Sequence, residues 1–311
     1  MQDISNDKPI FMIGMPRSGT SVLSEAISLH ENLGWFSNYL NQFPHLPALS
    51  ILNRFADMPL IGLYIRGKKK QEQGFFPTFK RFLPYSIEAF SVWELFFGKR
   101  FSFDYLIDKK PAAYESERVK RYVKKILLLQ NKKRFFAKLT GPSRIYFLLN
   151  VFPEAFFINI IRDPRAVVNS LLNVNFWKNS GGYQRPWWQN GLSEEDIDQW
   201  KKYANSPVAL GAVQWKRVVE LTDVEKKLLI PSRYIEIRYE DFIEKPHESL
   251  STIFQTFHLP DSKRAHRYVT SLGSLFNQNF KYKKRLSTKD IFIIEQITRK
   301  VASKKGYDLG I

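Results

Sequence analysis

A short apolar run that leads directly into a loop bounded by glycines constrains the fold of this chain more than any other segment. Residues 9–13 are Pro-Ile-Phe-Met-Ile, and the next residues, from Gly14 to Ser21, have the spacing G-x-x-x-x-G-x-S. An apolar pattern with helical spacing follows at residues 22–27. A strand, a glycine loop and a helix in this order direct backbone N–H groups and a helix N-terminus at an anion. The segment therefore predicts a phosphate-binding loop.

This loop differs from an ATP-binding P-loop at one position. Thr20 stands where the lysine of such a loop belongs, so γ-phosphoryl transfer from Mg-ATP is disfavoured. Arg17 offers a planar guanidinium whose paired N–H groups suit the oxygens of a phosphate or sulfate group. A simple turn between strand and helix is the alternative interpretation, and the complete Pro-Arg-Ser-Gly-Thr-Ser block favours anion binding.

Strand and helix patterns alternate along the rest of the chain. Three further apolar runs have the composition of buried strands: 135–139, 155–161 and 234–239. Three patterns predict helices: 144–151, 164–172 and one after Pro246. The helix that begins at Pro164 has Asp163 as its expected N-cap and Arg165 as a solvent-facing residue. This alternation is typical of an α/β fold, a parallel sheet with helices on both faces.

The long segment between the first helix and the second strand has a different character. Residues 36–133 contain no good strand pattern and many aromatic residues. We therefore expect one domain over residues 1–311, in which 36–133 form a mostly helical insertion after the first strand and helix.

Positive charge is concentrated in two stretches of this insertion. The chain has 48 Lys+Arg against 30 Asp+Glu, a net charge of +18. Residues 66–81 and 109–134 supply most of this surplus. In the second stretch, apolar residues at 119, 122, 123, 126 and 127 predict an amphipathic helix with basic residues off its apolar stripe. The surplus predicts an anionic partner, and no nucleic-acid-binding signature accompanies it, so nucleic acid is not the expected main partner.

Composition excludes several kinds of site. The chain has no cysteine, which removes disulfides, thiolate metal sites and cysteine nucleophiles. Its five histidines have no metal-ligand spacing, so no metal site is expected. The N-terminus has no apolar signal-like run, and Pro153 and Glu154 interrupt the most apolar stretch. We expect no transmembrane segment and a cytoplasmic location.

Two segments carry a family resemblance. The loop from Pro16 to Ser21 resembles the 5′-phosphosulfate loop of sulfotransferases that use 3′-phosphoadenosine 5′-phosphosulfate (PAPS). Residues 157–170, a strand that ends in Arg-Asp-Pro with a serine eight residues after the arginine, resemble the 3′-phosphate motif of the same enzymes. The resemblance implies PAPS as donor, adenosine 3′,5′-bisphosphate (PAP) as product, and these cofactor-binding residues: Arg17, Ser18, Gly19, Thr20, Ser21, Arg162 and Ser170.

Further segments extend the resemblance. Residues 138–153 are similar to a strand and helix of tyrosylprotein and carbohydrate sulfotransferases, in which a lysine at the position of Lys138 acts on the transferring sulfuryl group. Residues 238–242 resemble a family segment whose tyrosine, here Tyr239, lies near the 3′-phosphate. Residues 281–283 and 305–307 are similar to the family's C-terminal ending, with tyrosine in place of tryptophan.

The resemblance implies in-line sulfuryl transfer to an acceptor hydroxyl without a metal. Lys138 and Arg17 are the expected catalytic residues, because fixed positive charge stabilises the charge that develops during transfer. The base is open. Tyrosylprotein enzymes carry a glutamate and an arginine soon after the first helix, and the counterparts here fall in residues 37–40 without either. Candidates for a replacement are His45, Asp108 and Glu25, and the sequence does not choose among them.

Tryptophans offer a clue to the acceptor. Five of the seven lie between Trp177 and Trp215. The loop that carries Trp187 and Trp188 could stack on a sugar ring, or the tryptophans could belong to the core. We expect as acceptor a carbohydrate or small metabolite, with the insertion on the acceptor side.

Three hypotheses are compatible with the sequence. The first is a PAPS-dependent sulfotransferase, the second a P-loop nucleotide kinase, and the third a non-catalytic polyanion-binding protein. In the first, the basic stretches would dock an acidic acceptor or an anionic surface.

Overall fold

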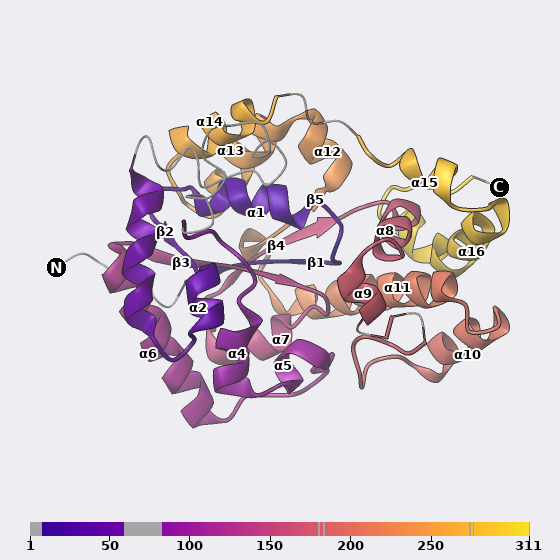
Figure 1. Ribbon diagram of the computed structural model, residues 1–311, viewed down its shortest axis with the longest axis horizontal. Coiled ribbons are helices and arrows are strands. Elements are labelled where there is room, and N and C mark those ends of the chain that lie inside the picture. Colours follow the sequence, from indigo (N-terminus) through magenta and orange to yellow (C-terminus); the bar gives the residue numbers. More distant parts are fainter. Residues whose placement is uncertain are drawn as a thin grey trace.

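Five parallel strands form the sheet at the centre of the molecule (Figure 1). The computed structural model describes residues 8–58, 83–179, 181–182, 184–273, 275 and 277–310. The strand order is β2-β3-β1-β4-β5. The strands are β1 (Ile10–Gly14), β2 (Leu33–Gly34), β3 (Arg134–Thr140), β4 (Phe156–Ile161) and β5 (Tyr234–Arg238). The four strands expected from the sequence are confirmed to within a residue at each end, and the α/β prediction is correct.

The central position of β1 places the phosphate loop in the middle of one sheet edge. Met12 lies opposite Lys138 of β3 on one side and Ile158 of β4 on the other. All four longer strands are parallel, so their carboxyl ends meet at this edge. Ligands of open parallel sheets bind at such an edge, where the chain leaves neighbouring strands in opposite directions.

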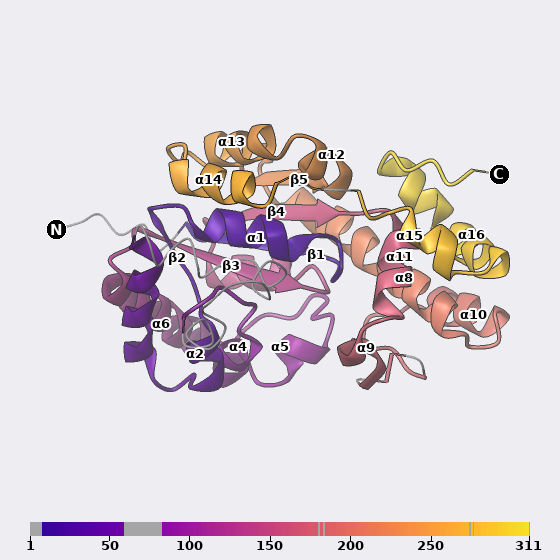
Figure 2. The same cartoon turned by 45° about the horizontal axis from the view of Figure 1, so that its top comes forward.

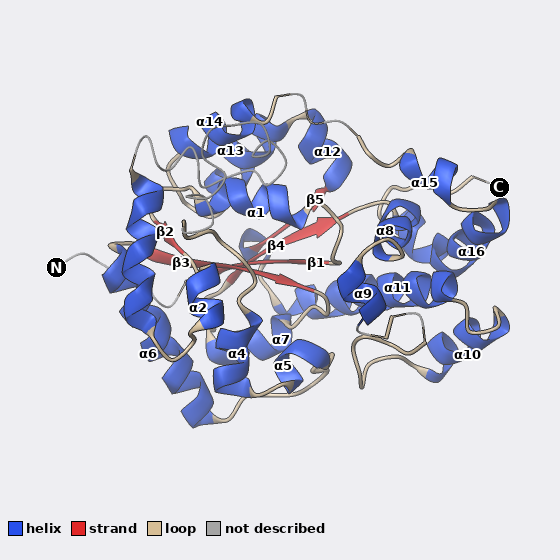
Figure 3. Ribbon diagram, in the orientation of Figure 1, coloured by secondary structure: helices blue, strands red, loops and turns tan. Residues whose placement is uncertain are grey.

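Helices cover both faces of the sheet (Figures 2 and 3). One face carries α1 (Thr20–Ser28), α12 (Tyr239–Glu244), α13 (Pro246–Thr256) and α14 (Lys263–Ser271). The other carries α4 (Phe90–Phe97), α5 (Arg100–Phe103), α6 (Ala113–Gln130) and α7 (Ile145–Val151). Successive residues of β1 alternate between the two cores, Ile10 and Met12 against α1 and Phe11 and Ile13 against the insertion.

A third group of helices lies beyond the carboxyl ends of the strands, on the right in Figure 1. Its members are α8 (Pro164–Leu171), α9 (Asn175–Asn179), α10 (Glu194–Lys202), α11 (Pro207–Glu225), α15 (Lys281–Arg285) and α16 (Thr288–Lys304). Short 3-10 turns at Lys226–Leu228 and Pro231–Arg233 connect α11 to β5. Helix α11 packs between α8 and α16, and this packing joins the C-terminus to the segment that follows β4.

The described part of the insertion is helical. It comprises α2 (Asn38–Gln42), the 3-10 helix η1 (Pro47–Asp57), α4, α5 and α6. Its aromatic residues pack on the sheet, with Trp93 stacked on Phe101 at a centroid distance of 5.1 Å and tilted against Phe11 of β1 at 6.1 Å. The basic stretch at 66–81 lies outside the described residues, and most of the stretch at 109–134 is helix α6.

We propose that this insertion and the sheet form one cooperative domain, and Trp93 tests the proposal. Its side chain is fully buried between the insertion helices and β1. Trp93→Ala should lower the free energy of unfolding by about 3–5 kcal/mol in urea denaturation, with one transition retained. The control Phe292→Ala, an exposed aromatic on α16, should change it by less than about 0.5 kcal/mol. Two separate transitions would contradict a single domain.

Candidate active site

The loop after β1 has the backbone of an anion cradle. Gly14 and Gly19 have φ angles of +139° and +88°, which glycine adopts without strain. A Cβ on Gly19 would lie 2.3 Å from the Tyr239 ring, so this glycine also permits a close approach. Helix α1 begins at Thr20 with no side-chain cap and no acidic residue in its first turn. Its first N–H groups are therefore directed at whatever anion the loop holds.

Two arginines predicted to bind the cofactor lie together beside this loop. Arg17 Nε donates to Ser170 Oγ at 2.8 Å, and Arg162 Nη1 donates to the carbonyl oxygen of Arg17 at 3.0 Å. Burial and the Arg162 charge lower the pKa of Arg17, and burial lowers the pKa of Arg162. Neither guanidinium forms an ion pair with a carboxylate of the described residues. The pair therefore holds positive charge that an anion would neutralise.

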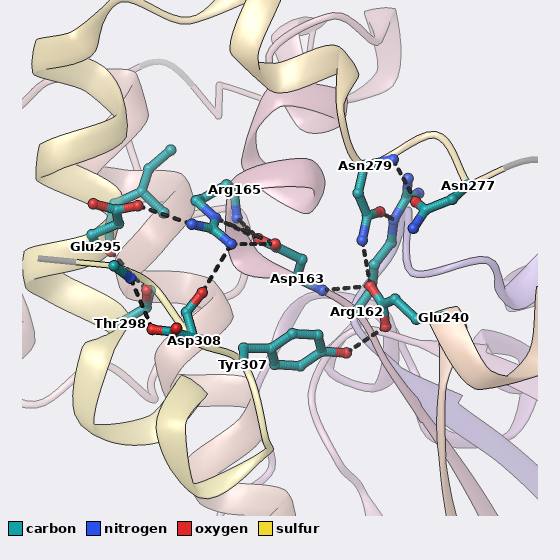
Figure 4. A network of polar contacts seen from close by, with 12 residues as sticks. Arg162, Asp163, Arg165, Glu240, Asn277, Asn279, Glu295, Thr298, Tyr307 and Asp308 are labelled. Carbon is teal, nitrogen blue, oxygen red and sulfur yellow. Dashed lines mark hydrogen bonds and ion pairs between the residues drawn. The ribbon is translucent and has the colours of Figure 1, made fainter.

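A network from the start of α12 and the C-terminal segment orients Arg162 (Figure 4). The guanidinium lies 4.1 Å from the centre of the Tyr239 ring, and its Nε donates to Asn279 Oδ1 at 2.8 Å. Asn279 in turn donates to Glu240, which also accepts from Tyr307 Oη at 2.8 Å. Tyr239 thus lies beside Arg162, and its place near the 3′-phosphate stays a prediction. Asn279 and Glu240 were not predicted, although Glu240 directly follows Tyr239.

The start of α8 confirms one sequence expectation and corrects another. Asp163 is the N-cap, and its carboxylate accepts from the backbone N–H of Arg165 at 2.8 Å. Arg165 does not face solvent. Its guanidinium pairs with Asp163 at 2.8 Å and with Glu295 of α16 at 3.0 Å, and its side chain is 14% exposed. Arg165 therefore joins α8 to α16 and holds the C-terminal segment near Arg162.

Lys138 lies on the other side of β1, in β3, and it has an unpredicted partner. Its buried Nζ lies 3.0 Å from Glu88 Oε1, and Thr140 Oγ1 donates to the same oxygen at 3.3 Å. Glu88 belongs to the loop before α4. Its carboxylate is 27% exposed, so one side of the pair is open to solvent.

The shortness of β2 makes room for this loop. β2 pairs only with the first two residues of β3, Arg134 and Phe135. Past that point the chain around Phe36 contacts residues 85–87, where Asn38 N donates to Tyr85 O at 3.1 Å and Ile87 N to Phe36 O at 3.4 Å. Residues from the insertion therefore reach the carboxyl half of β3. No local pattern marks Glu88, because the contact joins positions fifty residues apart.

None of the three base candidates forms a hydrogen bond or an ion pair with Arg17 or Lys138. Glu25 accepts a hydrogen bond from Tyr268 of α14. His45 is exposed in a turn after α2, beside α6. Asp108 is exposed in a turn and has a φ of +54°.

Most of the tryptophans belong to the core. Trp177, Trp188 and Trp215 are buried, so a stacking platform that uses Trp188 is wrong. Trp188 packs on Gly141, whose N–H donates to the carbonyl of Gly14 at 3.0 Å. Trp187 is half-buried and stacks on Trp188 at 5.6 Å and 11°. The Trp187 ring therefore lies near the loop after β1, and part of its surface is exposed to solvent.

The residues of this edge fit PAPS, whose ribose carries a phosphosulfate at the 5′ position and a phosphate at the 3′ position. The loop would hold the 5′-phosphosulfate with its N–H groups, and Ser18 Oγ is buried there without a hydrogen-bond partner. Arg17, Arg162 and Ser170 would hold the 3′-phosphate, since they converge and lack a carboxylate. The structure brings these predicted residues together at the edge between β1 and β4.

Comparisons with known proteins agree with this assignment. A family model described as "Sulfotransferase family" matches residues 9–263. The chain is 24% identical over 324 aligned residues to the omega-hydroxy-beta-dihydromenaquinone-9 sulfotransferase Stf3 of Mycobacterium bovis, and the match covers 97% of this chain and 76% of the relative. The fold is similar to that of sulfotransferase STF9 from Mycobacterium avium, with a TM-score of 0.56, 16% identity and coverage of 99% and 79% of the two chains.

Arg162→Ala should weaken the binding of PAP by about tenfold or more, because it removes a charged hydrogen-bond donor from the expected phosphate site. Isothermal titration calorimetry with PAP measures this loss. Arg299→Ala, a change of an exposed arginine on α16, is the matched control and should leave the affinity unchanged. Equal PAP affinity in both variants would remove Arg162 from the donor site.

Proposed function

Because the chain belongs to the sulfotransferase family, we propose that its site holds the donor between β1 and β4 and the acceptor beside β3. The protein is an enzyme that transfers the sulfuryl group of PAPS to an acceptor hydroxyl, which confirms the first of the three hypotheses. The nucleotide kinase and the non-catalytic polyanion-binding protein are set aside. Individual residues of the site then have distinct roles in this reaction.

On the donor side, the proposed roles follow the positions of the charged groups. Ser18, Gly19, Thr20 and Ser21 bind the 5′ end through the loop and the first turn of α1. Arg162, Ser170 and Tyr239 bind the 3′-phosphate. Arg17 was expected to act both in binding and in catalysis, and its contact with Ser170 supports the binding role. A bidentate guanidinium contributes to orientation as well as affinity at such a site.

On the acceptor side, the ion pair of Lys138 and Glu88 supports a catalytic role for both residues. PAPS supplies an activated sulfuryl group. Lys138 Nζ provides a fixed positive charge for the oxygens that become more negative during transfer. Glu88 accepts the proton of the acceptor hydroxyl, and its ion pair with Lys138 at 3.0 Å holds the carboxylate at the same edge. This pair is the observation that carries the proposal.

The acceptor proposal rests on Trp187. A carbohydrate or small metabolite could stack on this half-buried ring. The Mycobacterium bovis relative is named for a hydroxylated dihydromenaquinone, which supports a lipid alcohol as a second acceptor class. We also propose a cytoplasmic location for the protein, which cell fractionation tests.

Glu88→Gln should lower kcat by about 100-fold or more, because general bases contribute roughly 10²–10⁴-fold. PAP affinity should change by less than a factor of two, since Glu88 does not touch the donor residues. The decline of turnover on acidification, which reports protonation of the base, should disappear in the variant.

The control for this experiment is Glu94→Gln, a half-buried glutamate of α4 on the same insertion. It should keep the wild-type pH profile and kcat. If Glu88→Gln retains the acidic limb of the profile, Glu88 only positions Lys138 and another group is the base.

An assay with labelled PAPS against sugars, phenols and lipid alcohols identifies the acceptor class. With the best acceptor, Trp187→Ala should raise the acceptor KM several-fold and leave PAP affinity intact, since removal of a stacking ring affects only the acceptor. A wild-type KM in this variant would show that the acceptor does not lie on Trp187.

A further inference from the structure

The 3-10 helix η1 has an inverted pattern of burial. Its buried positions, Ser50, Asn53 and Ala56, recur every third residue and are small or polar. The Asn53 amide donates to the Trp35 carbonyl at 2.9 Å, so polar contacts hold the inner face. The larger apolar residues Ile51 and Phe55 are exposed instead, while Leu49 is half-buried against the core. A helix that buries its polar side and exposes its apolar side is suited to an apolar environment beyond the protein.

Five large apolar residues are exposed in residues 43–58, the stretch that contains η1. They are Phe43, Leu46, Ile51, Phe55 and Met58, with exposed fractions between 42% and 53%. They account for a third of the exposed large hydrophobic residues of the described chain. Single exposed apolar residues are common on proteins, but five within sixteen residues are a patch that calls for a partner. We call these five residues the apolar ridge.

A basic surface adjoins the apolar ridge. η1 packs along α6, and Arg54 Nε of η1 donates to the carbonyl of Leu129 at 2.7 Å. Helix α6 exposes four cationic side chains: Arg118, Arg121, Lys124 and Lys125. None of the four forms an ion pair with a carboxylate of the described residues. Their charge is therefore available to an external anion.

A groove joins the ridge to the basic surface. It has a volume of about 410 Å³ and lies between the turn after α2 and helices α4 and α6. Apolar and aromatic side chains line it together with Arg118, Arg121 and Lys125. The groove and the ridge share the segment 43–47. Pro44, His45 and Pro47 line the groove, and Phe43 and Leu46 between and beside them belong to the ridge.

Acidic groups do not offset this surface. In residues 38–58 the only carboxylate is Asp57, which pairs with Lys132 at 2.8 Å and also with Arg264. On α6, Glu115 is buried against Arg100 at 2.7 Å, and the exposed Glu117 pairs with Lys120 at 3.1 Å, so neither forms an ion pair with the four cations. The apolar ridge and the cations of α6 are thus neighbours, because η1 packs along α6, the helix at the left in Figure 1.

We propose that the apolar ridge and the basic surface of α6 dock the protein on an anionic lipid bilayer. The cations contact lipid phosphates, and the apolar side chains enter the boundary between headgroups and acyl chains. A nucleic acid would not use aliphatic residues such as Leu46, Ile51 and Met58, so the ridge favours lipid over that partner. The docking is peripheral, because no helix of the described residues has the length and apolar character needed to cross a bilayer.

Vesicle flotation tests this docking without PAPS or an acceptor, so its result is independent of the proposed chemistry. The wild-type protein should bind vesicles that contain phosphatidylglycerol and should bind pure phosphatidylcholine vesicles much more weakly. The variant Arg118→Gln/Arg121→Gln/Lys125→Gln should bind the anionic vesicles about 100-fold more weakly at low salt, about fivefold for each charge. Ile51→Asn/Phe55→Asn should also weaken binding, and its remaining binding should be more sensitive to salt.

Matched control variants lie at the opposite end of the molecule, on α16. Arg299→Gln/Lys300→Gln/Lys304→Gln removes three exposed charges, and Phe292→Asn removes an exposed aromatic ring. Both should bind anionic vesicles within a factor of two of the wild type. PAP affinity and the thermal midpoint verify that every variant is folded.

Three outcomes would overturn the proposal. The first is wild-type protein that fails to bind anionic vesicles. The second is an equal loss of vesicle binding in the α6 and α16 charge variants, which would indicate that net charge alone attracts the protein to the vesicles. The third is unchanged vesicle binding in the ridge variant with tighter binding of a single-stranded oligonucleotide by the wild type, which would assign the surface to nucleic acid.

Discussion

Two guanidinium groups lie close together at the carboxyl ends of β1 and β4, and the surrounding structure must hold them there against their mutual repulsion. Arg162 bonds to the backbone of Arg17, and Arg17 bonds to Ser170, yet no carboxylate of the described residues neutralises either charge. Close cations repel one another, so the surrounding structure must hold them. The Tyr239 ring, Asn279 and the buried start of α8 do this. These contacts hold the two charges in place for the phosphate group that we propose they bind.

The residues that the sequence predicted for the donor half lie together because they belong to two continuous segments. A strand that runs directly into a loop or an N-capped helix places its side chains within a few residues of one another. Arg17 was named from the loop pattern, and Arg162 and Ser170 from the family resemblance, and the structure brings the three together. Tyr239 came from the family resemblance, and the structure places it beside Arg162.

The acceptor half could not be predicted in the same way. Glu88 reaches Lys138 only because β2 is two residues long and leaves the edge of β3 uncovered. A strand of two residues is too short to show the alternation of apolar and polar residues from which strands are predicted. Helix α11 was missed for a related reason, because twelve of its nineteen residues are buried and it has no single apolar face.

The link from Arg162 to the C-terminus has a consequence for the energetics of the whole chain. Asn279 and Tyr307 lie beyond residue 263, where the family match ends, yet Asn279 contacts Arg162 and both contact Glu240. With Arg162 in the proposed donor site, donor binding is coupled to the docking of the segment that runs from Asn279 to Tyr307. We therefore expect the C-terminal segment to be held more tightly while donor or product is bound and less tightly after release.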